Sequence, residues 1–209
     1  MYGYPFKSKY HSMQLKRFKM HGLERKTARV YLGIEPSKSG KFVVGDHACP
    51  KILRYQFSDE FVLNISDECC NKLKKEPLKQ WQKENNKPYA ITGVMRAEGG
   101  QREHATCLAF SSNKLLRFNP LAPVSENWEK WLIREYDIKI CDIYKPPYNF
   151  TRTGCKGCPF NIHLQKELET LKKYFPDERK QCEIIWGKVY EEYRRIGYRL
   201  PQRKRGTTK

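Results

Sequence analysis

The segment SDECCNKLKKEPL, residues 66–78, contains two adjacent cysteines, Cys69 and Cys70. A second pair, Cys155 and Cys158, stands far along the chain in RTGCKGCPF, residues 152–160. Neighbouring cysteines do not readily form a disulfide with each other, because the required geometry strains the peptide between them. Four thiolates from two segments can instead close a zinc site or hold an iron–sulfur cluster. The two pairs therefore predict a metal centre around which the fold is organised.

The residues around both pairs suit an anionic centre. Ser66 and Asp67 offer N-cap side chains for a helix that carries the first pair, and the positive end of a helix dipole favours thiolate. Gly154 and Gly157 let the backbone fold tightly around the second pair. A centre held by four thiolates is negatively charged, so nearby cations stabilise it. The basic side chains in these two segments are Lys72, Lys74, Lys75, Arg152 and Lys156.

The composition indicates a basic protein with an anionic partner. The chain has 209 residues, with 41 Lys and Arg against 23 Asp and Glu, and a formal charge of +18. Such an excess favours nucleic acid, nucleotide phosphates or sulfate as ligands. No run of 18 apolar residues is present, and the basic residues 1–26 lack the apolar core of a secretory signal. We therefore expect no membrane segment, and eight cysteines without a signal indicate the reducing cytoplasm.

Apolar periodicity and capping residues predict helices and strands in alternation. Four stretches are apolar and β-prone: residues 61–65, 89–95, 107–110 and 115–118. Helices are expected over residues 5–22 with an end at Gly22, over 24–32, from Pro77 to about Asn85, after Ser125, over 162–174 and over about 177–196.

Strands separated by helices favour an α/β layered domain. We expect one domain over residues 1–200, followed by a basic disordered tail at 201–209. Within it, residues 1–32 form a basic helical segment, residues 61–160 a core for the cluster and a nucleotide, and residues 161–198 the closing helices.

Six further residues are expected to pack in the core. Trp128 and Trp131 stand at helical spacing after Ser125. Single cysteines commonly behave as small buried apolar side chains, and four of the eight are single: Cys49, Cys107, Cys141 and Cys182.

The pattern CC-x-x-x-K-x-x-PL followed by GC-x-x-C resembles the cluster-binding pattern of assimilatory adenylyl-sulfate reductases. These enzymes belong to the phosphoadenosine phosphosulfate reductase family, whose fold is that of the adenine-nucleotide α-hydrolases. The resemblance implies a [4Fe-4S] cluster, with zinc as the alternative, and it places Lys74 beside the cluster. Leu73 departs from the pattern, because the reductases usually have arginine at that position. The implied metal ligands are Cys69, Cys70, Cys155 and Cys158.

The segment GVMRAEGGQR, residues 93–102, is similar to the part of these enzymes that faces the nucleotide phosphosulfate. The resemblance implies that Arg96 and Arg102 bind substrate, together with Lys74 and Arg152. Arginine suits this role because its guanidinium forms paired hydrogen bonds with phosphate and sulfate oxygens. No catalytic residue is assigned.

Two motifs of the reductases are missing from these 209 residues. The string SGGxDS, the phosphate loop, does not occur, and the tail GYRLPQRKRGTTK lacks the catalytic cysteine. The chain thus resembles the C-terminal two-thirds of such a protein, over roughly residues 1–175. A separate phosphate-loop subunit or a homo-oligomer would then complete the site.

Two functions from different classes remain open. The first is a nucleotide–sulfur enzyme part or subunit, of the sulfonucleotide reductase or sulfurtransferase kind, that binds an adenine nucleotide or another phosphate or sulfate ligand. The second is a non-catalytic, metal-stapled basic module that binds nucleic acid or a protein partner. A steep fall of nucleic-acid affinity with salt, without nucleotide binding, would favour the module.

Overall fold

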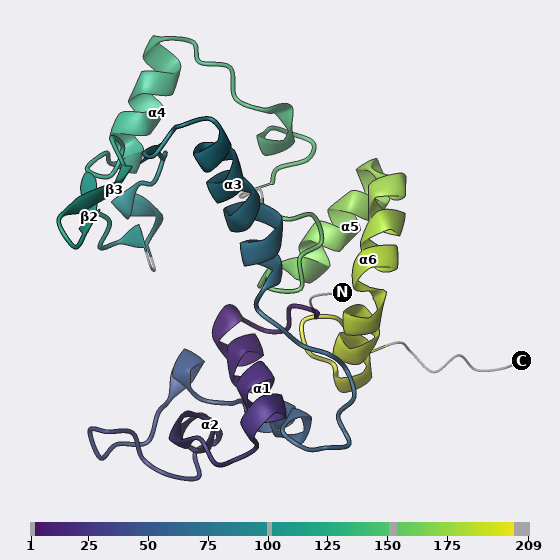
Figure 1. Ribbon diagram of the computed structural model, residues 1–209. Coiled ribbons are helices and arrows are strands. Elements are labelled where there is room, and N and C mark those ends of the chain that lie inside the picture. Colours follow the sequence, from purple (N-terminus) through teal and green to yellow (C-terminus); the bar gives the residue numbers. More distant parts are fainter. Residues whose placement is uncertain (1–2, 100–101, 151–153, 203–209) are drawn as a thin grey trace, which may run out of the picture. The chain divides into compact units, whose positions relative to one another are not determined.

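The computed structural model describes residues 3–99, 102–150 and 154–202 (Figure 1). Contacts divide the chain into two compact units, Met1–Lys72 with Lys145–Lys209 (unit 1) and Leu73–Tyr144 (unit 2). Both borders fall inside the expected core at 61–160, and the expectation of a single domain stays a prediction. None of the helices in the described ranges is long and apolar enough to cross a membrane.

Unit 1 begins with two short helices whose ends follow from local sequence. The side chain of Ser8 accepts a hydrogen bond from the backbone N–H of His11 and thereby caps the first helix. Gly22, with φ of 55°, ends it as expected. The helical segments of this half are α1 (Lys9–His21), α2 (Lys26–Leu32) and the 3₁₀ turns η1 (Gly45–His47) and η2 (Lys51–Gln56).

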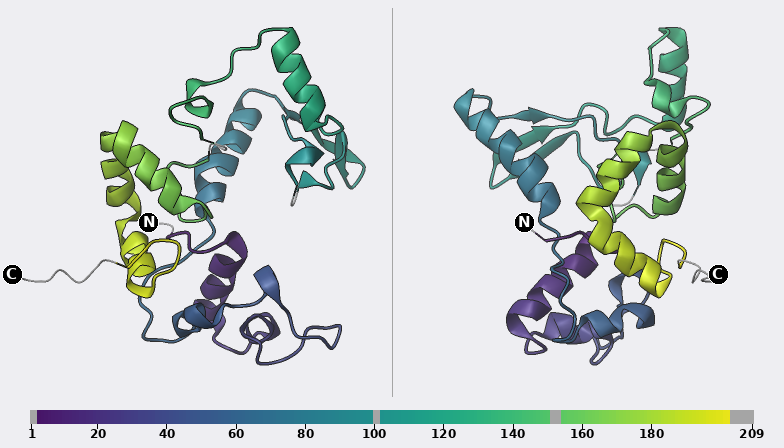
Figure 2. Two further views of the ribbon diagram at one scale, coloured as in Figure 1. Left: turned by 180° about the vertical axis from the view of Figure 1, so that it is seen from behind. Right: turned by 90° about the vertical axis from the view of Figure 1, so that its right-hand side faces the viewer.

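The C-terminal half of unit 1 is a helical hairpin of α5 (Leu164–Tyr174) and α6 (Pro176–Ile196). The two helices lie side by side in both views of Figure 2. Pro176 occupies the first turn of α6, where its missing N–H costs nothing. Gly197, with φ of 66°, ends the helix in the left-handed conformation.

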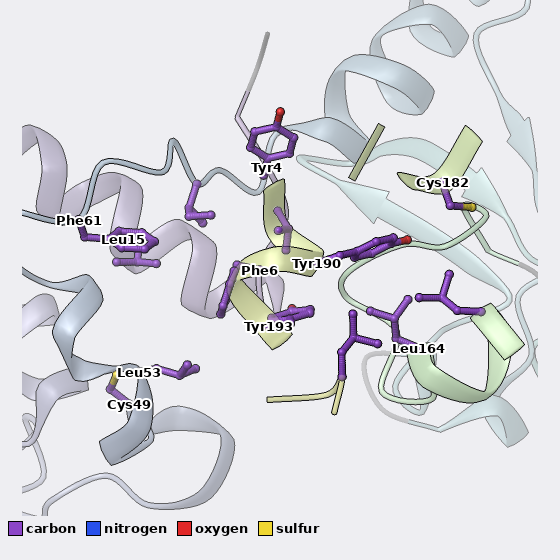
Figure 3. Packing of buried hydrophobic residues seen from close by; sticks show 14 of the residues in the cluster. Tyr4, Phe6, Leu15, Cys49, Leu53, Phe61, Leu164, Cys182, Tyr190 and Tyr193 are labelled. Atoms are coloured by element: carbon purple, nitrogen blue, oxygen red, sulfur yellow. The ribbon is translucent and has the colours of Figure 1, made fainter. Parts of the chain in front are cut away.

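The core of unit 1 joins the two ends of the chain (Figure 3). Phe6, Tyr31, Tyr190 and Tyr193 are all 0% exposed, and the rings of Phe6 and Tyr193 have centroids 4.5 Å apart. The N-terminal segment therefore packs directly on α6, although most of the sequence separates the two.

A buried histidine forms part of this core. His11 is 0% exposed, with Nδ1 2.8 Å from the hydroxyl of Tyr31 and Nε2 2.7 Å from Oε1 of Gln56. The amide oxygen of Gln56 can only accept, so Nε2 carries the proton and Nδ1 accepts from Tyr31. Burial, with smaller contributions from Lys7 and Arg199, lowers the pKa of His11 to about 4, although the hydrogen bond to Gln56 acts in the opposite direction.

Unit 2 contains the three-stranded mixed sheet. Its strands are β1 (Ala90–Ile91), β2 (Leu108–Ser111) and β3 (Lys114–Phe118), in the order β1-β3-β2. The pair β1–β3 is parallel, with Ala90 opposite Arg117, and β2–β3 is an antiparallel hairpin. The helical segments are η3 (Asn71–Lys75), which crosses the border between the units, α3 (Glu76–Glu84), η4 (Arg96–Glu98), α4 (Glu126–Glu135) and η6 (Asp142–Tyr144).

The combination of helices with a small mixed sheet confirms the α/β class. The expected strand at 61–65 is only a single bridge between Tyr4 and Ile65, and the one at 89–95 shrinks to β1. A strand needs a partner for its backbone groups, and β3 supplies one only as far as the bond from Thr92 N–H to the carbonyl of Phe118.

Burial in unit 2 differs from the expectation. Trp128 and Trp131 are each 45% exposed, although α4 forms as predicted with Ser125 as its cap. Cys107 and Cys141 are exposed as well, whereas Cys49 and Cys182 of unit 1 are buried as expected. Helical spacing shows that side chains share a face, and only the packing of other elements on that face makes it a core.

Candidate metal centre

All four predicted cysteine ligands belong to unit 1. Cys69 and Cys70 open the helical stretch that continues into η3, and Cys155 and Cys158 lie in the turn before α5. The backbone N–H of Cys158 donates to the carbonyl of Cys155 at 3.0 Å, which closes this turn. All four are partly buried free thiols.

The thiols of the two pairs lie near enough to affect one another. Withdrawal from water, together with the neighbouring sulfurs of Cys70 and Cys158, raises the pKa of Cys69 to about 12. Burial likewise raises the pKa of Cys158 to about 11, with added contributions from Cys155 and Cys70. The fold therefore brings together two cysteine pairs that are far apart in sequence.

Four cysteine sulfurs are chemically suitable ligands for a metal ion or an iron–sulfur cluster. Burial and neighbouring sulfurs raise the pKa of Cys69 and Cys158, and a bound cation would favour ionisation of such thiols. Within residues 3–99, 102–150 and 154–202, no three side chains of Cys, His, Asp or Glu are already arranged to hold a metal ion. What the structure supplies is the convergence of the four residues in one unit.

A carboxylate of α5 fastens the C-x-x-C turn. Oε1 of Glu167 accepts the backbone N–H of Gly157 at 2.8 Å, and Oε2 accepts from the side chain of Asn161. A carboxylate that receives two N–H donors holds them more tightly than a neutral acceptor would. No feature of the sequence singled out Glu167, because its partner lies in the turn ten residues earlier.

Helix α6 closes the turn from the other side. The hydroxyl of Tyr190 donates to the carbonyl of Gly157, and a Cβ placed on Gly157 would lie 2.6 Å from Sγ of Cys182. Gly157 has φ of 62°, so this position requires glycine both for backbone conformation and for space. Cys182, which is not a predicted ligand, is thus buried and packs against the C-x-x-C turn.

The lysine between the two cysteines is neutralised by α6. The ammonium of Lys156 pairs with Glu178 and donates to the side chain of Gln181 at 3.0 Å. The backbone carbonyl of Lys156 accepts a hydrogen bond from the indole N–H of Trp186 at 3.2 Å. Lys156 therefore contributes to the position of the turn as well as to its charge.

The predicted substrate residues lie in the other unit or outside the described residues. Arg96 begins η4 in unit 2 and donates to the carbonyl of Ala122 at 3.2 Å. Arg102 follows η4 and pairs with Glu98. Lys74 is exposed in η3, and Arg152 lies outside the described residues. The two arginines thus share one surface turn, and the four cysteines share unit 1.

Comparison with known proteins identifies the family. The model of the phosphoadenosine phosphosulfate reductase domain matches residues 42–161, a shorter range than the expected 1–175. Neither a curated protein nor a solved structure matches the chain. The matched range covers more than half of the 209 residues, and it contains both cysteine pairs and the turn with Arg96 and Arg102. The chain belongs to the phosphoadenosine phosphosulfate reductase domain family.

Proposed function

We propose that the protein is an iron–sulfur member of this family and acts as part or subunit of a nucleotide–sulfur enzyme, a sulfonucleotide reductase or a sulfurtransferase. The observation that carries the proposal is the convergence in unit 1 of Cys69, Cys70, Cys155 and Cys158. The sulfurs of the other pair contribute to the raised pKa of both Cys69 and Cys158. Family membership supports the sulfur chemistry.

The four cysteines would hold the cluster, and Glu167 and Tyr190 would keep the C-x-x-C turn in place. A bound cluster with four thiolates supplies an electrostatic field or a structural staple rather than an open coordination position. The chain's own contribution would be to fix the thiols at the edge of a stable core.

Arg96 and Arg102 would bind the phosphate or sulfate of an adenine nucleotide. Arg102 is paired with Glu98 on the surface, with both side chains about two-fifths exposed, and such a pair contributes little free energy. An incoming phosphate can therefore replace the carboxylate at small cost, and it accepts paired hydrogen bonds from the guanidinium.

Metal analysis of the anaerobically purified chain tests the cluster. We expect about four iron and four sulfide per chain, with a broad absorbance at about 400 nm. Cys69→Ser and Cys155→Ser should lose the iron, and Cys107→Ser, an exposed cysteine of unit 2, is the matched control. Stoichiometric zinc without iron would instead support the alternative, a metal-stapled module that binds nucleic acid or a protein partner.

Nucleotide binding tests the arginines. Adenylyl sulfate and AMP are titrated into the wild type, into Arg96→Gln with Arg102→Gln, and into Arg117→Gln, an exposed arginine of β3. We expect the double variant to lose at least about tenfold in affinity, the scale of one forked charged contact, and the control to bind normally. Equal affinity in all three proteins would remove the two arginines from the site.

A further inference from the structure

Two arginines of α6 meet at one carboxylate oxygen. Arg179 and Arg194 each donate from Nη2 to Oε1 of Glu183 at 2.6 Å. Both guanidinium groups also lie over the ring of Tyr190, with their central carbons 5.9 Å and 5.8 Å from its centroid. Direct contacts therefore place two cations around one anion. The three charged side chains, which we call the arginine cluster, keep one uncompensated positive charge.

Each arginine of the cluster also has a donor nitrogen without an acceptor. Nη1 of Arg179 and Nη1 of Arg194 are both buried, and neither has a hydrogen-bond partner within residues 3–99, 102–150 and 154–202. The two side chains are only 19% and 16% exposed. A buried donor that stays unpaired costs about 1–3 kcal/mol, and more when it is charged. Two such donors in one cluster favour a further acceptor that serves both guanidinium groups.

Space for an acceptor lies on the same face of α6. Gly187 stands in the middle of this 21-residue helix, where glycine costs about 1 kcal/mol relative to alanine. Apart from the helix backbone, a Cβ placed on Gly187 would have one neighbour within 4 Å in the described part of the chain, Oε2 of Glu183 at 4.0 Å. Positions 183, 187, 190 and 194 follow one another at helical spacing. The absent side chain therefore leaves room beside the carboxylate, along the helix between the two arginines.

The arginine cluster is connected to the C-x-x-C turn through Tyr190. The ring of Tyr190 lies near both guanidinium groups, and its hydroxyl donates to the carbonyl of Gly157. Lys156 of the same turn is neutralised by its pair with Glu178, so it does not supply the missing negative charge. An anion bound at the arginines would thus be separated from the turn by one side chain.

We propose that Arg179 and Arg194 form a binding site for a small tetrahedral oxyanion, sulfate or phosphate, either free or as the terminal group of a nucleotide. Glu183 occupies this site in the free protein. Its side chain is 36% exposed, so it can turn toward solvent when an oxyanion with more charge and more acceptor oxygens takes its place. Guanidinium groups bind such oxyanions through paired hydrogen bonds. Both arginines lie outside the range 42–161 that matches the family domain, and the site is additional to the proposed turn at Arg96 and Arg102.

The alternative is a purely structural ion cluster in which the carboxylate alone serves the two arginines. The two differ in what happens when the carboxylate is removed. A structural cluster loses its counter-charge in Glu183→Gln and is destabilised without any gain in anion binding. An oxyanion site loses its built-in competitor and binds anions more tightly.

The unfolding temperature of the full chain is measured against sodium sulfate and sodium phosphate at low millimolar concentration, with sodium chloride at matched ionic strength. A ligand of the folded state raises this temperature with the logarithm of its concentration. We expect Glu183→Gln to need at least tenfold less sulfate or phosphate than the wild type for the same rise. The matched control is Glu191→Gln, which removes an exposed carboxylate of the same helix and should respond like the wild type.

Loss of a guanidinium should have the opposite effect. Glu183→Gln combined with Arg194→Gln should need at least tenfold more anion than Glu183→Gln alone. Lys188→Gln, which removes an exposed lysine of the same helix, should leave the response of the wild type unchanged. AMP separates the two sources of the oxyanion in Glu183→Gln. A tighter response to AMP than to phosphate, lost with Arg194→Gln, would identify a nucleotide phosphate, and an equal or weaker one would identify the free anion.

Gly187→Leu tests the site without touching its charges. Leucine favours a helix more than glycine does, so this variant should fold, and its side chain would fill the space beside Glu183. It should need at least tenfold more anion than the wild type. The proposal is overturned if Gly187→Leu and Glu183→Gln both respond like the wild type, or if sodium chloride reproduces the shifts. The readout requires neither a bound cluster nor Arg96, so failure here is distinct from failure of the proposed function.

Discussion

Unit 1 and unit 2 bury their aromatic side chains to very different extents. Tyr31, Tyr190 and Tyr193 of unit 1 are 0% exposed, whereas Trp128 and Trp131 of unit 2 are 45% exposed. Unit 1 is assembled from both ends of the chain, and unit 2 from one continuous stretch of residues 73–144. Among the described residues, unit 1 therefore contains the larger buried core, to which both ends of the chain contribute.

The charge is also unequally divided. Unit 1 contains 29 Lys and Arg against 14 Asp and Glu, while unit 2 contains 12 against 9. The four cysteines belong to unit 1, and the predicted nucleotide arginines belong to unit 2. The comparison teaches that the proposed metal ligands rest on the better packed scaffold, whereas Arg96 and Arg102 lie where fewer contacts restrain them.

Truncation of one leucine in each unit tests the comparison most strongly. Leu15 in α1 is 1% exposed and Leu78 in α3 is 52% exposed. We expect Leu15→Ala to lower the free energy of unfolding by about 2–5 kcal/mol, because it leaves a cavity. Leu78→Ala should cost less than ~1 kcal/mol, as measured by urea unfolding followed by circular dichroism. Equal losses would mean that α3 is covered in solution, and the contrast between the units would fail.

Glycine substitutions compare the two units at single turns. At Gly157 a Cβ would lie 2.5 Å from the hydroxyl oxygen of Tyr190, whereas at Gly93 in unit 2 the nearest atom is 3.9 Å away. We expect Gly157→Ala to cost roughly 3 kcal/mol, from overpacking and a left-handed backbone. Gly93→Ala and Gly154→Ala, which has open space, should stay within about 1 kcal/mol in thermal unfolding. A stable Gly157→Ala protein would show that the turn moves freely.

Carboxylate removal compares a fastened turn with a surface ion pair. Glu167 of unit 1 accepts two N–H groups, and Glu98 of unit 2 pairs with Arg102 in solvent. We expect Glu167→Ala to lower the free energy of unfolding by about 2 kcal/mol, and Glu98→Ala by less than ~1 kcal/mol. Chemical denaturation measures both. Similar small effects would argue against a fastened turn.

The pH dependence of stability should originate in unit 1. His11 has a pKa near 4 in the folded protein and about 6.5 when unfolded. The unfolded chain therefore binds the extra proton first, and stability falls as pH drops from about 6.5 to 4. The slope is about 1.4 kcal/mol per pH unit. His11→Gln should remove this slope, and His104→Gln, exposed in unit 2, should keep it. An unchanged slope in His11→Gln would assign it to other groups.

Much of the local structure could be predicted from short-range signals. Gly22 ends α1, Ser125 caps α4, and Pro77 stands at the start of α3 as expected. The hairpin strands β2 and β3 also form within a residue or two of their predicted positions. Capping, proline and glycine act within a few residues of themselves, so a sequence window contains the relevant physics.

Burial was predicted less well, because it depends on elements that are distant in sequence. Cys107 and Cys182 look alike as single cysteines, yet the first is exposed on the sheet and the second is buried behind Gly157. Likewise, residues 61–65 have strand composition but find only Tyr4 as a bridge partner. Composition predicts what a segment prefers, and partners decide whether the preference is realised.

The sequence by itself determined the family, the two cysteine pairs, the basic charge and the helix ends, because residue identity and close spacing carry that information. Tertiary structure alone decided that Glu167 and Tyr190 hold the C-x-x-C turn and that His11 is buried neutral. It also decided that Lys7 meets Tyr193, 186 residues away. Such contacts depend on how the whole chain closes around its core, and no local preference specifies which distant residues will then meet.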